Sequence, residues 1–392
     1  MSASSPWHRR HPVCMSGSLL CLWLLVMGSL LAGCVPANPA PAVPTLMATA
    51  VIPGSTPPGS LHTIALPGTY TPVPHTIMPA TPVPAPTLAA SPTNPPTPGP
   101  SPTPDPYAGL TIDELAQRPY HGSPLQIVET LADLPAFTRS LITYVSDGLT
   151  IYGFMNTPKN VPADGALPVV IVLHGYVDPA DYAVQDYTTP YADALAAAGY
   201  LVLHPNYRNY PPSDSGPNLF RVGYAIDTLN LIAAIKEQAG EPGPLAQADP
   251  AAIYLFGHSM GGGIALRVLT VSPDVRAAVL YGAMSGDERQ NFERILAWSG
   301  GEDGRLELAT NDDLLQRISP GSYLDRIQAP VSLHHGLDDG VVPSLWSDQL
   351  CEALRSLDKV VECFHYPGQP HNFDATARQR LLRNVRAFFS NN

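Results

Sequence analysis

The spacing of hydrophobic and polar residues predicts a sheet-forming domain from about Leu110 to the end of the chain. The segment "LITYVSDGLTIYGFMNTP" alternates apolar and polar positions around "SDG", which is typical of an antiparallel hairpin. Five continuous apolar runs follow: "LPVVIVLHG", "YLVLHPNYR", "AAIYLFGHS", "RAAVLYGAMS" and "APVSLHHG". Runs of this second kind are typical of strands that are covered on both faces.

Amphipathic stretches separate these runs and predict helices over residues 191–198, 220–239, 261–270, 344–357 and 372–389. Buried strands that alternate with helices imply right-handed crossovers, so we predict an α/β fold with helices on both faces of the sheet. We expect a mainly parallel sheet of about eight strands with an antiparallel start, held in one domain over residues 107–392. In such a sheet, functional residues gather at the carboxyl ends of the strands.

Residues 286–323 fit no strand and helix unit, and they include Trp298 and several acidic residues. We interpret this segment as a small helical cap over the site, and a surface excursion is the alternative.

The N-terminal region carries a targeting signal. Arg9 and Arg10 precede an apolar run over residues 19–31, which is too short to span a bilayer comfortably and favours a cleaved signal peptide over residues 1–33. The run ends in "LAGC", which resembles the lipobox of bacterial lipoproteins. That resemblance implies cleavage before Cys34, acylation of its thiol and anchoring to the membrane outside the cytoplasm. An ordinary secretory signal, which would release the protein, is the alternative.

Residues 34–106 have the composition of a tether. Between Val35 and Pro106 there are 22 prolines, and no Lys, Arg, Asp or Glu occurs from His11 to Pro104. A segment with so few large apolar side chains cannot offset the entropy of ordering itself, so we expect an extended Pro/Thr-rich spacer.

Charge and cysteine content narrow the function classes. The net charge of -12 argues against a nucleic-acid partner. If Cys34 carries lipid, Cys351 and Cys363 remain after signal cleavage, and they form either one disulfide or two buried thiols.

The segment "YLFGHSMGGG" contains the pattern G-x-S-x-G between a strand-like run and a helical run. In such an elbow the serine has a strained backbone, so the residues two before and two after it, Gly257 and Gly261, must be tiny. The helix that begins behind Ser259 directs N–H groups at the place where an oxyanion would form. These features indicate that Ser259 is a nucleophile.

A serine hydroxyl needs a histidine as base and an acid that orients the histidine. When the serine lies in such an elbow on an α/β sheet, the acid follows the serine in the chain and the histidine follows the acid. His371 follows a late strand and is the candidate base, whereas His334, His335 and His365 lie on or against strands and are expected to be packed or hydrogen-bonded. The residues alone leave the acid open between the adjacent Asp338 and Asp339.

Together these motifs resemble the α/β-hydrolase superfamily, particularly its dienelactone-hydrolase-like and prolyl-oligopeptidase-like branch, over residues 141–389. In that branch the acid lies in an "HG-x-x-D-x-x-VP" turn, and His335, Gly336, Asp339, Val342 and Pro343 match it. The resemblance therefore selects Asp339. It also assigns the oxyanion hole to the N–H groups of Met260 and of Tyr176, which follows "HG" in "LHGYVDP".

The expected function is that of a serine hydrolase without a cofactor or metal, most simply a carboxylesterase acting on small or medium esters through an acyl-enzyme. A serine peptidase acting on short peptides is the alternative; peptide-cleaving relatives usually carry a β-propeller ahead of the catalytic domain, and only a spacer and roughly 30 residues precede it here. A binding lipoprotein that has lost turnover is the third possibility. Asn206, Arg208 and Asp227 are expected to hold loops and helices in place.

Overall fold

The structure is a computed structural model, and it describes residues 105–161 and 165–392. The predicted signal peptide, Cys34 and almost all of the predicted tether lie outside the described residues. Within the described ranges, no helix is both long enough and apolar enough to cross a membrane.

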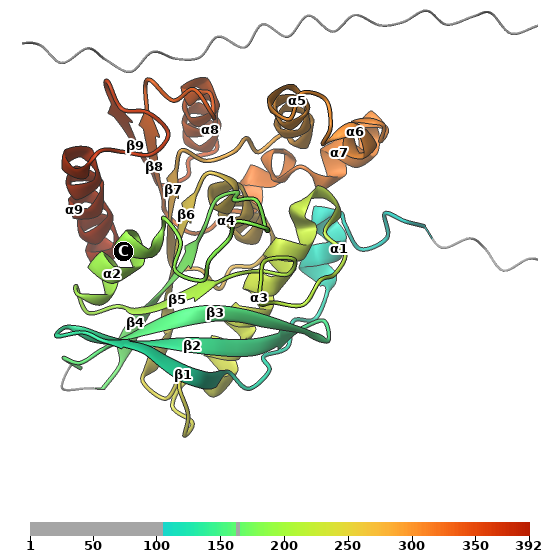
Figure 1. Ribbon diagram of the computed structural model, residues 1–392. Helices are drawn as coiled ribbons and strands as arrows, with labels where there is room; N and C mark the ends of the chain where they lie inside the picture. The colour runs from blue at the N-terminus through green and yellow to red at the C-terminus, as the bar shows by residue number, and fades with distance from the viewer. Residues whose placement is uncertain (1–104, 162–164) are drawn as a thin grey trace, which may run out of the picture. The chain divides into compact units, whose positions relative to one another are not determined.

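A nine-stranded sheet forms the centre of the domain, in the order β1-β2-β3-β5-β4-β6-β7-β8-β9 (Figure 1). The pairs β1–β2, β2–β3 and β3–β5 are antiparallel, and every later pair is parallel, so the prediction of a mainly parallel sheet with an antiparallel start is confirmed. The strands are β1 (Gln126–Asp133), β2 (Phe137–Ser146), β3 (Leu149–Pro158), β4 (Leu167–Leu173), β5 (Leu201–Pro205), β6 (Ala248–His258), β7 (Ala277–Tyr281), β8 (Val331–Gly336) and β9 (Val361–Tyr366).

The ninth strand, β1, is absent from the sequence-based prediction. It is an edge strand whose residues are mostly exposed, including Ile127 and Val128, and its pairing with β2 is interrupted by two register shifts. A strand that buries neither face regularly has no period-2 pattern, so hydrophobic alternation gives no sign of it.

The helices cover both faces of the sheet (Figure 1). They are α1 (Ile112–Gln117), α2 (Thr189–Ala196), η1 (Leu219–Arg221), α3 (Val222–Gln238), α4 (Met260–Val271), α5 (Glu288–Trp298), α6 (Arg305–Leu308), α7 (Asp312–Ile318), η2 (Pro320–Arg326), α8 (Ser344–Ser356) and α9 (Ala375–Asn391). The five predicted helices correspond to α2, α3, α4, α8 and α9. Strand β4 shows the two-sided burial: Val170 and Val172 join the cluster with α2 and α9, whereas Val169 and Ile171 join the cluster with α3, α4 and α8.

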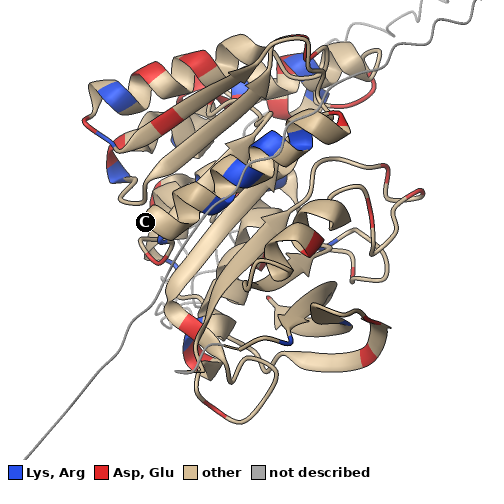
Figure 2. Ribbon diagram, turned by 90° about the vertical axis from the view of Figure 1, so that its left-hand side faces the viewer, with Lys and Arg blue, Asp and Glu red and all other residues tan. Residues whose placement is uncertain are grey.

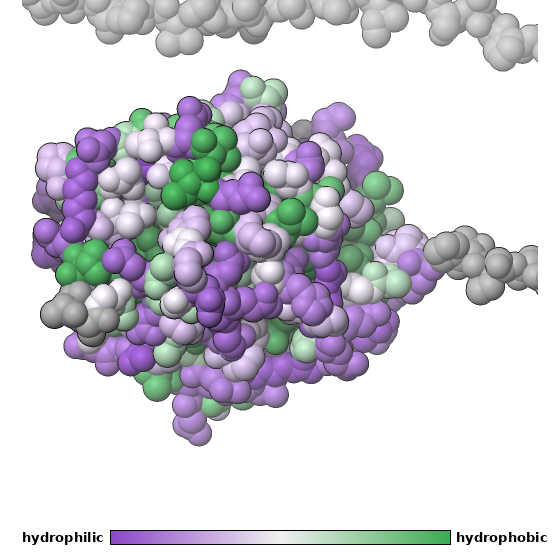
Figure 3. Space-filling model, turned by 90° about the horizontal axis from the view of Figure 1, so that it is seen from below, coloured by the Kyte–Doolittle hydropathy of each residue, from purple (hydrophilic) through white to green (hydrophobic). Residues whose placement is uncertain are grey.

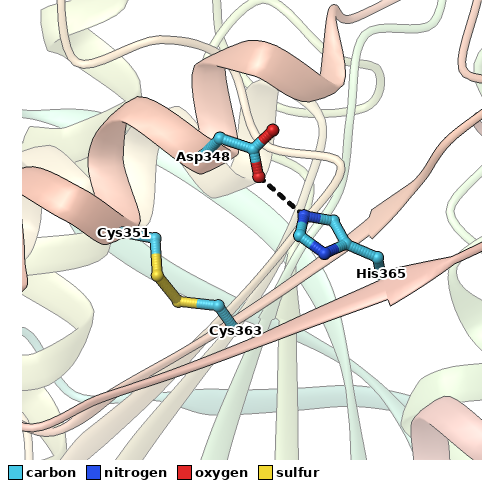
Figure 4. Close-up of a disulfide and its surroundings, with 4 residues drawn as sticks. All are labelled: Asp348, Cys351, Cys363 and His365. Carbon is cyan, nitrogen blue, oxygen red and sulfur yellow. Dashed lines mark hydrogen bonds and ion pairs between the residues drawn. A yellow bond between two sulfur atoms is a disulfide. The ribbon is translucent and has the colours of Figure 1, made fainter.

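A disulfide joins Cys351 on α8 to Cys363 on β9 (Figure 4). This resolves the alternative that the sequence leaves open between a bridge and two thiols. Beside it, His365 Nε2 lies 2.6 Å from Asp348 Oδ1 on α8. The outermost parallel strand is therefore linked to its covering helix both covalently and by a polar contact.

The surface of the domain is mixed in charge and polarity. Figure 2 shows basic residues along α9, which carries Arg378, Arg380, Arg383 and Arg386, in a chain of net negative charge. Figure 3 views the domain from below, where hydrophilic residues surround smaller hydrophobic areas.

Candidate active site

Ser259 stands at a sharp turn between the end of β6 and the start of α4. Its backbone has φ 56° and ψ -119°, a region that non-glycine residues rarely adopt and that costs of order 1–3 kcal/mol. Glycines make the turn possible: a Cβ on Gly257 would lie 2.4 Å from the Gly261 carbonyl oxygen, and one on Gly261 would lie 2.1 Å from the Leu173 carbonyl oxygen. The predicted strand, elbow and helix are present as expected.

His371 and Asp339 meet through a hydrogen bond. His371 Nδ1 donates to Asp339 Oδ2 over 2.6 Å, since a carboxylate only accepts. The proton on Nδ1 leaves Nε2 of a neutral His371 free to accept one. The structure therefore brings together the predicted base and the predicted acid from the loops that follow β9 and β8.

Asp339 is held by more than His371. Its Oδ1 accepts from the N–H groups of Val341 and Val342 over 2.8 and 2.9 Å, and His335 Nε2 lies 3.1 Å from its Oδ2. Burial alone would raise the pKa of Asp339, but the hydrogen bonds from His335 and His371 outweigh burial and lower the pKa well below its usual range. Asp339 is thus a carboxylate at neutral pH.

Asp338, the other candidate acid, takes part in the same turn through its backbone. Its N–H donates to the Gln369 carbonyl oxygen over 3.0 Å, whereas Asp339 Oδ1 accepts from the N–H groups of the turn. The loop turns Asp339 inward, where one carboxylate can serve both the turn and His371.

The two predicted oxyanion donors lie in the same cavity as Ser259 and His371. This cavity has a volume of about 790 Å³ and is lined in part by Tyr176, Met260 and Met284. Met260 is the first residue of α4, where N–H groups have no partner within the helix.

The predicted second donor is the N–H of Tyr176, and the peptide that carries it is oriented by His174. The carbonyl oxygen of Gly175 lies 2.7 Å from Nδ1 of the buried His174. Because a trans peptide directs its C=O and N–H to opposite sides, the N–H of Tyr176 points away from His174. Tyr176 itself lines the cavity, which is compatible with the predicted role of its N–H.

A hydrogen-bonded chain, which sequence reasoning missed, connects the three loops of the site. Gly175 N–H donates to Tyr187 Oη over 2.9 Å, and Tyr187 Oη lies 2.9 Å from His258 Nδ1. His258 Nε2 lies 3.2 Å from the His371 carbonyl oxygen, which can only accept, so Nε2 carries the proton and Nδ1 accepts from Tyr187. Burial, followed by the proximity of His371, lowers the pKa of His258 to about 3, so this ring stays neutral at working pH.

The sequence hints at only one of the two side chains, Tyr187 and His258, that link Gly175 to the loop of His371. His258 lies inside "GHSMG", directly before the candidate nucleophile, whereas Tyr187 occurs in a loop without a recognisable motif. The His371 carbonyl oxygen also accepts from Tyr281 Oη over 2.8 Å. The loop that carries His371 is therefore fixed from two sides.

The three other candidate histidines are packed or hydrogen-bonded, as predicted. His334 is buried between Ser332 and Tyr366, with its ring nitrogens 3.0 and 2.9 Å from their hydroxyls, and burial lowers its pKa to about 3. His335 is buried against Asp339 and Ser347, and His365 pairs with Asp348 at the surface.

Asn206, Arg208 and Asp227 have the structural roles that the sequence suggests. Arg208 Nη2 lies 2.8 Å from Asp227 Oδ1, and Arg208 N–H donates to Oδ2 over 2.8 Å. Asn206 donates to the Pro211 carbonyl oxygen over 3.0 Å. The Arg208 contacts tie the loop after β5 to α3, and the Asn206 contact holds the loop to itself.

The segment expected to form a cap, residues 286–323, contains α5, α6 and α7 and supplies one wall of the cavity. Its cavity residues are Phe292, Arg294, Ile295, Trp298, Asp303 and Glu307. Trp298 meets Tyr176 edge-on, with ring centroids 5.6 Å apart, and Arg294 Nε donates to the Val341 carbonyl oxygen over 2.9 Å. This segment, which is called the cap below, therefore touches both the Tyr176 loop and the Asp339 loop.

No group of three or more His, Cys, Asp or Glu side chains suited to a metal ion occurs in the part of the chain that the structure describes.

Comparisons with known proteins agree with the predicted resemblance. A family model described as alpha/beta hydrolase fold matches residues 168–303. A putative carboxymethylenebutenolidase of Escherichia coli is 24% identical over 265 residues, which are 61% of this chain and 83% of that protein. The uncharacterised peptidase YtmA of Bacillus subtilis is 24% identical over 257 residues, which are 64% of this chain and 92% of that protein.

Solved structures share the fold. A puromycin-hydrolysing peptidase of Mycobacterium tuberculosis matches with a TM-score of 0.52 and 23% identity, over 67% of this chain but only 41% of the peptidase. An acetyl xylan esterase from Paenibacillus matches with a TM-score of 0.51 and 19% identity, over 70% of this chain and 92% of the esterase. At these identities the likeness concerns the fold alone.

Proposed function

We propose that this chain, which has the α/β-hydrolase fold, is a serine hydrolase with Ser259 as nucleophile, His371 as base and Asp339 as acid. The observation that carries the proposal is the 2.6 Å bond from His371 to Asp339, in a cavity that also exposes the strained Ser259 elbow. A strained serine in the same cavity as a histidine of defined tautomer is the arrangement that acyl transfer requires.

In the first step His371 Nε2 takes the proton of the Ser259 hydroxyl while its oxygen attacks the substrate carbonyl carbon. The ionised Asp339 stabilises the imidazolium that forms. The oxyanion of the tetrahedral intermediate accepts from the N–H groups of Met260 and Tyr176.

Collapse of the intermediate breaks the bond to the leaving alcohol, which takes its proton from His371, and leaves the acyl group on Ser259. Water then attacks the acyl carbonyl with His371 again acting as the base. The bond between Ser259 Oγ and the acyl carbon breaks, His371 returns the proton to Ser259 Oγ, and the carboxylic acid leaves. The chemistry requires no cofactor.

We propose carboxylic esters as the substrates. Supporting this choice, apolar and aromatic side chains form much of the cavity wall, among them Phe292, Ile295 and Trp298. Such a wall suits an ester with apolar groups better than a peptide, whose buried amides would each need a partner. Hydrolysis of short peptides is the outcome that would overturn the choice of ester.

Labelling and kinetics test the proposal. The purified domain should react with a fluorophosphonate probe and hydrolyse 4-nitrophenyl esters, and Ser259→Ala should abolish labelling and lower kcat by about a millionfold. A panel of esters and aminoacyl arylamides then separates esterase from peptidase. If Ser259→Ala kept the rate of the parent, the assignment of the nucleophile would be wrong.

We also propose that the protein is anchored by lipid on Cys34 outside the cytoplasm. The disulfide between Cys351 and Cys363 supports this location, because disulfides persist in oxidising compartments. Expression of the full chain in a bacterium tests the anchor: Cys34→Ala should move the protein from the membrane fraction to the soluble fraction. Equal membrane association of both forms would contradict the anchor.

A further inference from the structure

Three aromatic side chains with exposed surface line the candidate active-site cavity, and the proposed chemistry uses none of their rings. Tyr176, Trp298 and Trp346 come from the loop after β4, the end of α5 and the start of α8. Tyr176 is 48% exposed and Trp298 is 62% exposed, although both rings are large and apolar. Clusters of exposed apolar side chains on a soluble domain usually mark a binding site.

The geometry of the first two rings indicates which chemical class of group binds there. Tyr176 and Trp298 meet edge-on, with an interplanar angle of 89° and centroids 5.6 Å apart. An edge-to-face pair leaves ring faces and edges open to a third ring, which can stack on one and place its edge against the other. An aliphatic chain would gain the same burial without the complementary quadrupole of an aromatic guest.

The position of the pair decides which molecule supplies that ring. The backbone N–H of Tyr176 is the proposed oxyanion donor, so its side chain starts beside the reacting carbonyl. Trp298 lies in the same cavity as Ser259 and His371. The cavity volume of about 790 Å³ is far larger than an acetyl or ethyl group needs and is within the range typical of sites for ring-containing ligands.

We propose that Tyr176 and Trp298 form a subsite for an aromatic ring of the substrate, so that the natural substrates are aryl-bearing esters. This inference rests on the proposed function, because it assigns a substrate class to the same site. Trp298 acts as a specificity-determining residue from the cap, and Trp346 extends the aromatic wall.

Matched esters test the subsite, because they vary the ring while reactivity changes little. The pairs are benzyl and cyclohexylmethyl acetate on the alcohol side, and ethyl phenylacetate and ethyl cyclohexylacetate on the acyl side, with ethyl acetate as the small reference. In the parent protein kcat/KM should favour the aromatic member of at least one pair by about tenfold. Trp298→Leu keeps an apolar side chain and should remove that preference, so that kcat/KM falls about tenfold more for the aromatic ester than for ethyl acetate.

Leu306→Ala is the matched control, since Leu306 is an exposed residue of α6 that does not line the cavity. It should leave every rate unchanged. Equal rates for the aromatic and alicyclic members of both pairs, or an equal loss on all esters in Trp298→Leu, would overturn the subsite alone. By contrast, a folded parent protein that shows no Ser259-dependent hydrolysis of any ester would overturn the proposed function.

Discussion

The cavity has two walls that are built in different ways. The strand-end wall carries Ser259, Asp339 and His371, all largely or fully buried and held through contacts with neighbouring loops. The cap wall, residues 286–323, presents exposed side chains such as Trp298. Rigid placement suits the chemical step, because its rate depends on the positions of the reacting atoms to within fractions of an ångström. The choice of substrate needs only a surface complementary to the substrate.

The cap is nevertheless anchored at its beginning. Glu288, the first residue of α5, forms buried ion pairs with Arg267 of α4 and Arg221 of η1, and its N–H donates to Ser319 Oγ over 2.9 Å. Further along α5, Arg294 donates to the Val341 and Gly340 carbonyl oxygens, and the exposed Trp298 meets Tyr176 edge-on. Changes in the strand-end wall should therefore affect every substrate, and changes at the far end of α5 should affect some substrates more than others.

The largest expected effect after loss of the nucleophile comes from Asp339→Asn. The amide would reverse the hydrogen bond to His371 Nδ1 and favour the wrong tautomer, so kcat should fall about ten-thousandfold for all esters with KM little changed. Steady-state kinetics measure this. Asp338→Asn is the matched control and should stay within about threefold of the parent, whereas equal losses in both variants would contradict the choice of Asp339.

Tyr187→Phe should have a smaller but equally general effect. It removes the hydroxyl that accepts from Gly175 N–H and donates to His258, so the loop of Tyr176 loses a fixed position. We expect kcat to fall about ten- to a hundredfold with KM unchanged, because the oxyanion forms after binding. An increase in KM with constant kcat would instead assign Tyr187 to substrate binding.

Acid should destabilise the core through its buried histidines, a residue type that the cap does not contain. The pKa values of His258 and His334 are lowered to about 3. Between pH 6.5 and 3 these two rings are therefore protonated in the unfolded chain and neutral in the folded one. The free energy of unfolding should thus fall as pH drops through this window, by about 1.4 kcal/mol per unit for each ring.

Chemical denaturation of His334→Gln tests that effect. Between pH 7 and pH 5 this variant should lose about 2 kcal/mol less stability than the parent, because one buried ring no longer contributes. Parallel pH profiles for the two proteins would show that His334 takes no part.

The smallest expected effect concerns Arg294→Ala, which removes the contacts from α5 to the Gly340 and Val341 carbonyl oxygens. These contacts are partly exposed, so stability should change by less than about 1 kcal/mol. Rates on bulky esters should fall about threefold more than the rate on ethyl acetate, since the cap wall loosens while the strand-end wall stays in place. A uniform loss on all esters would mean that Arg294 supports Asp339 instead.

Much of the fold can be predicted from the sequence, because the buried strands and their helices must carry continuous or periodic apolar residues. Strand β1 and helix α1 were missed for a physical reason. β1 buries little surface, and α1 has only six residues, although Thr111 and Glu114 form the capping box that marks its start.

The sequence by itself determined the candidate residues of the site: the G-x-S-x-G pattern, the later histidine and the pair of acids have a chain order that restricts their roles. Tertiary structure alone decided which oxygens and nitrogens meet. The path of one loop turns Asp339 toward His371, the packing of α8 against β9 pairs Cys351 with Cys363, and the fold brings Tyr187 to His258. Local sequence patterns indicate which residues are buried and where the backbone is strained. Contacts between distant segments depend on how the whole sheet is assembled.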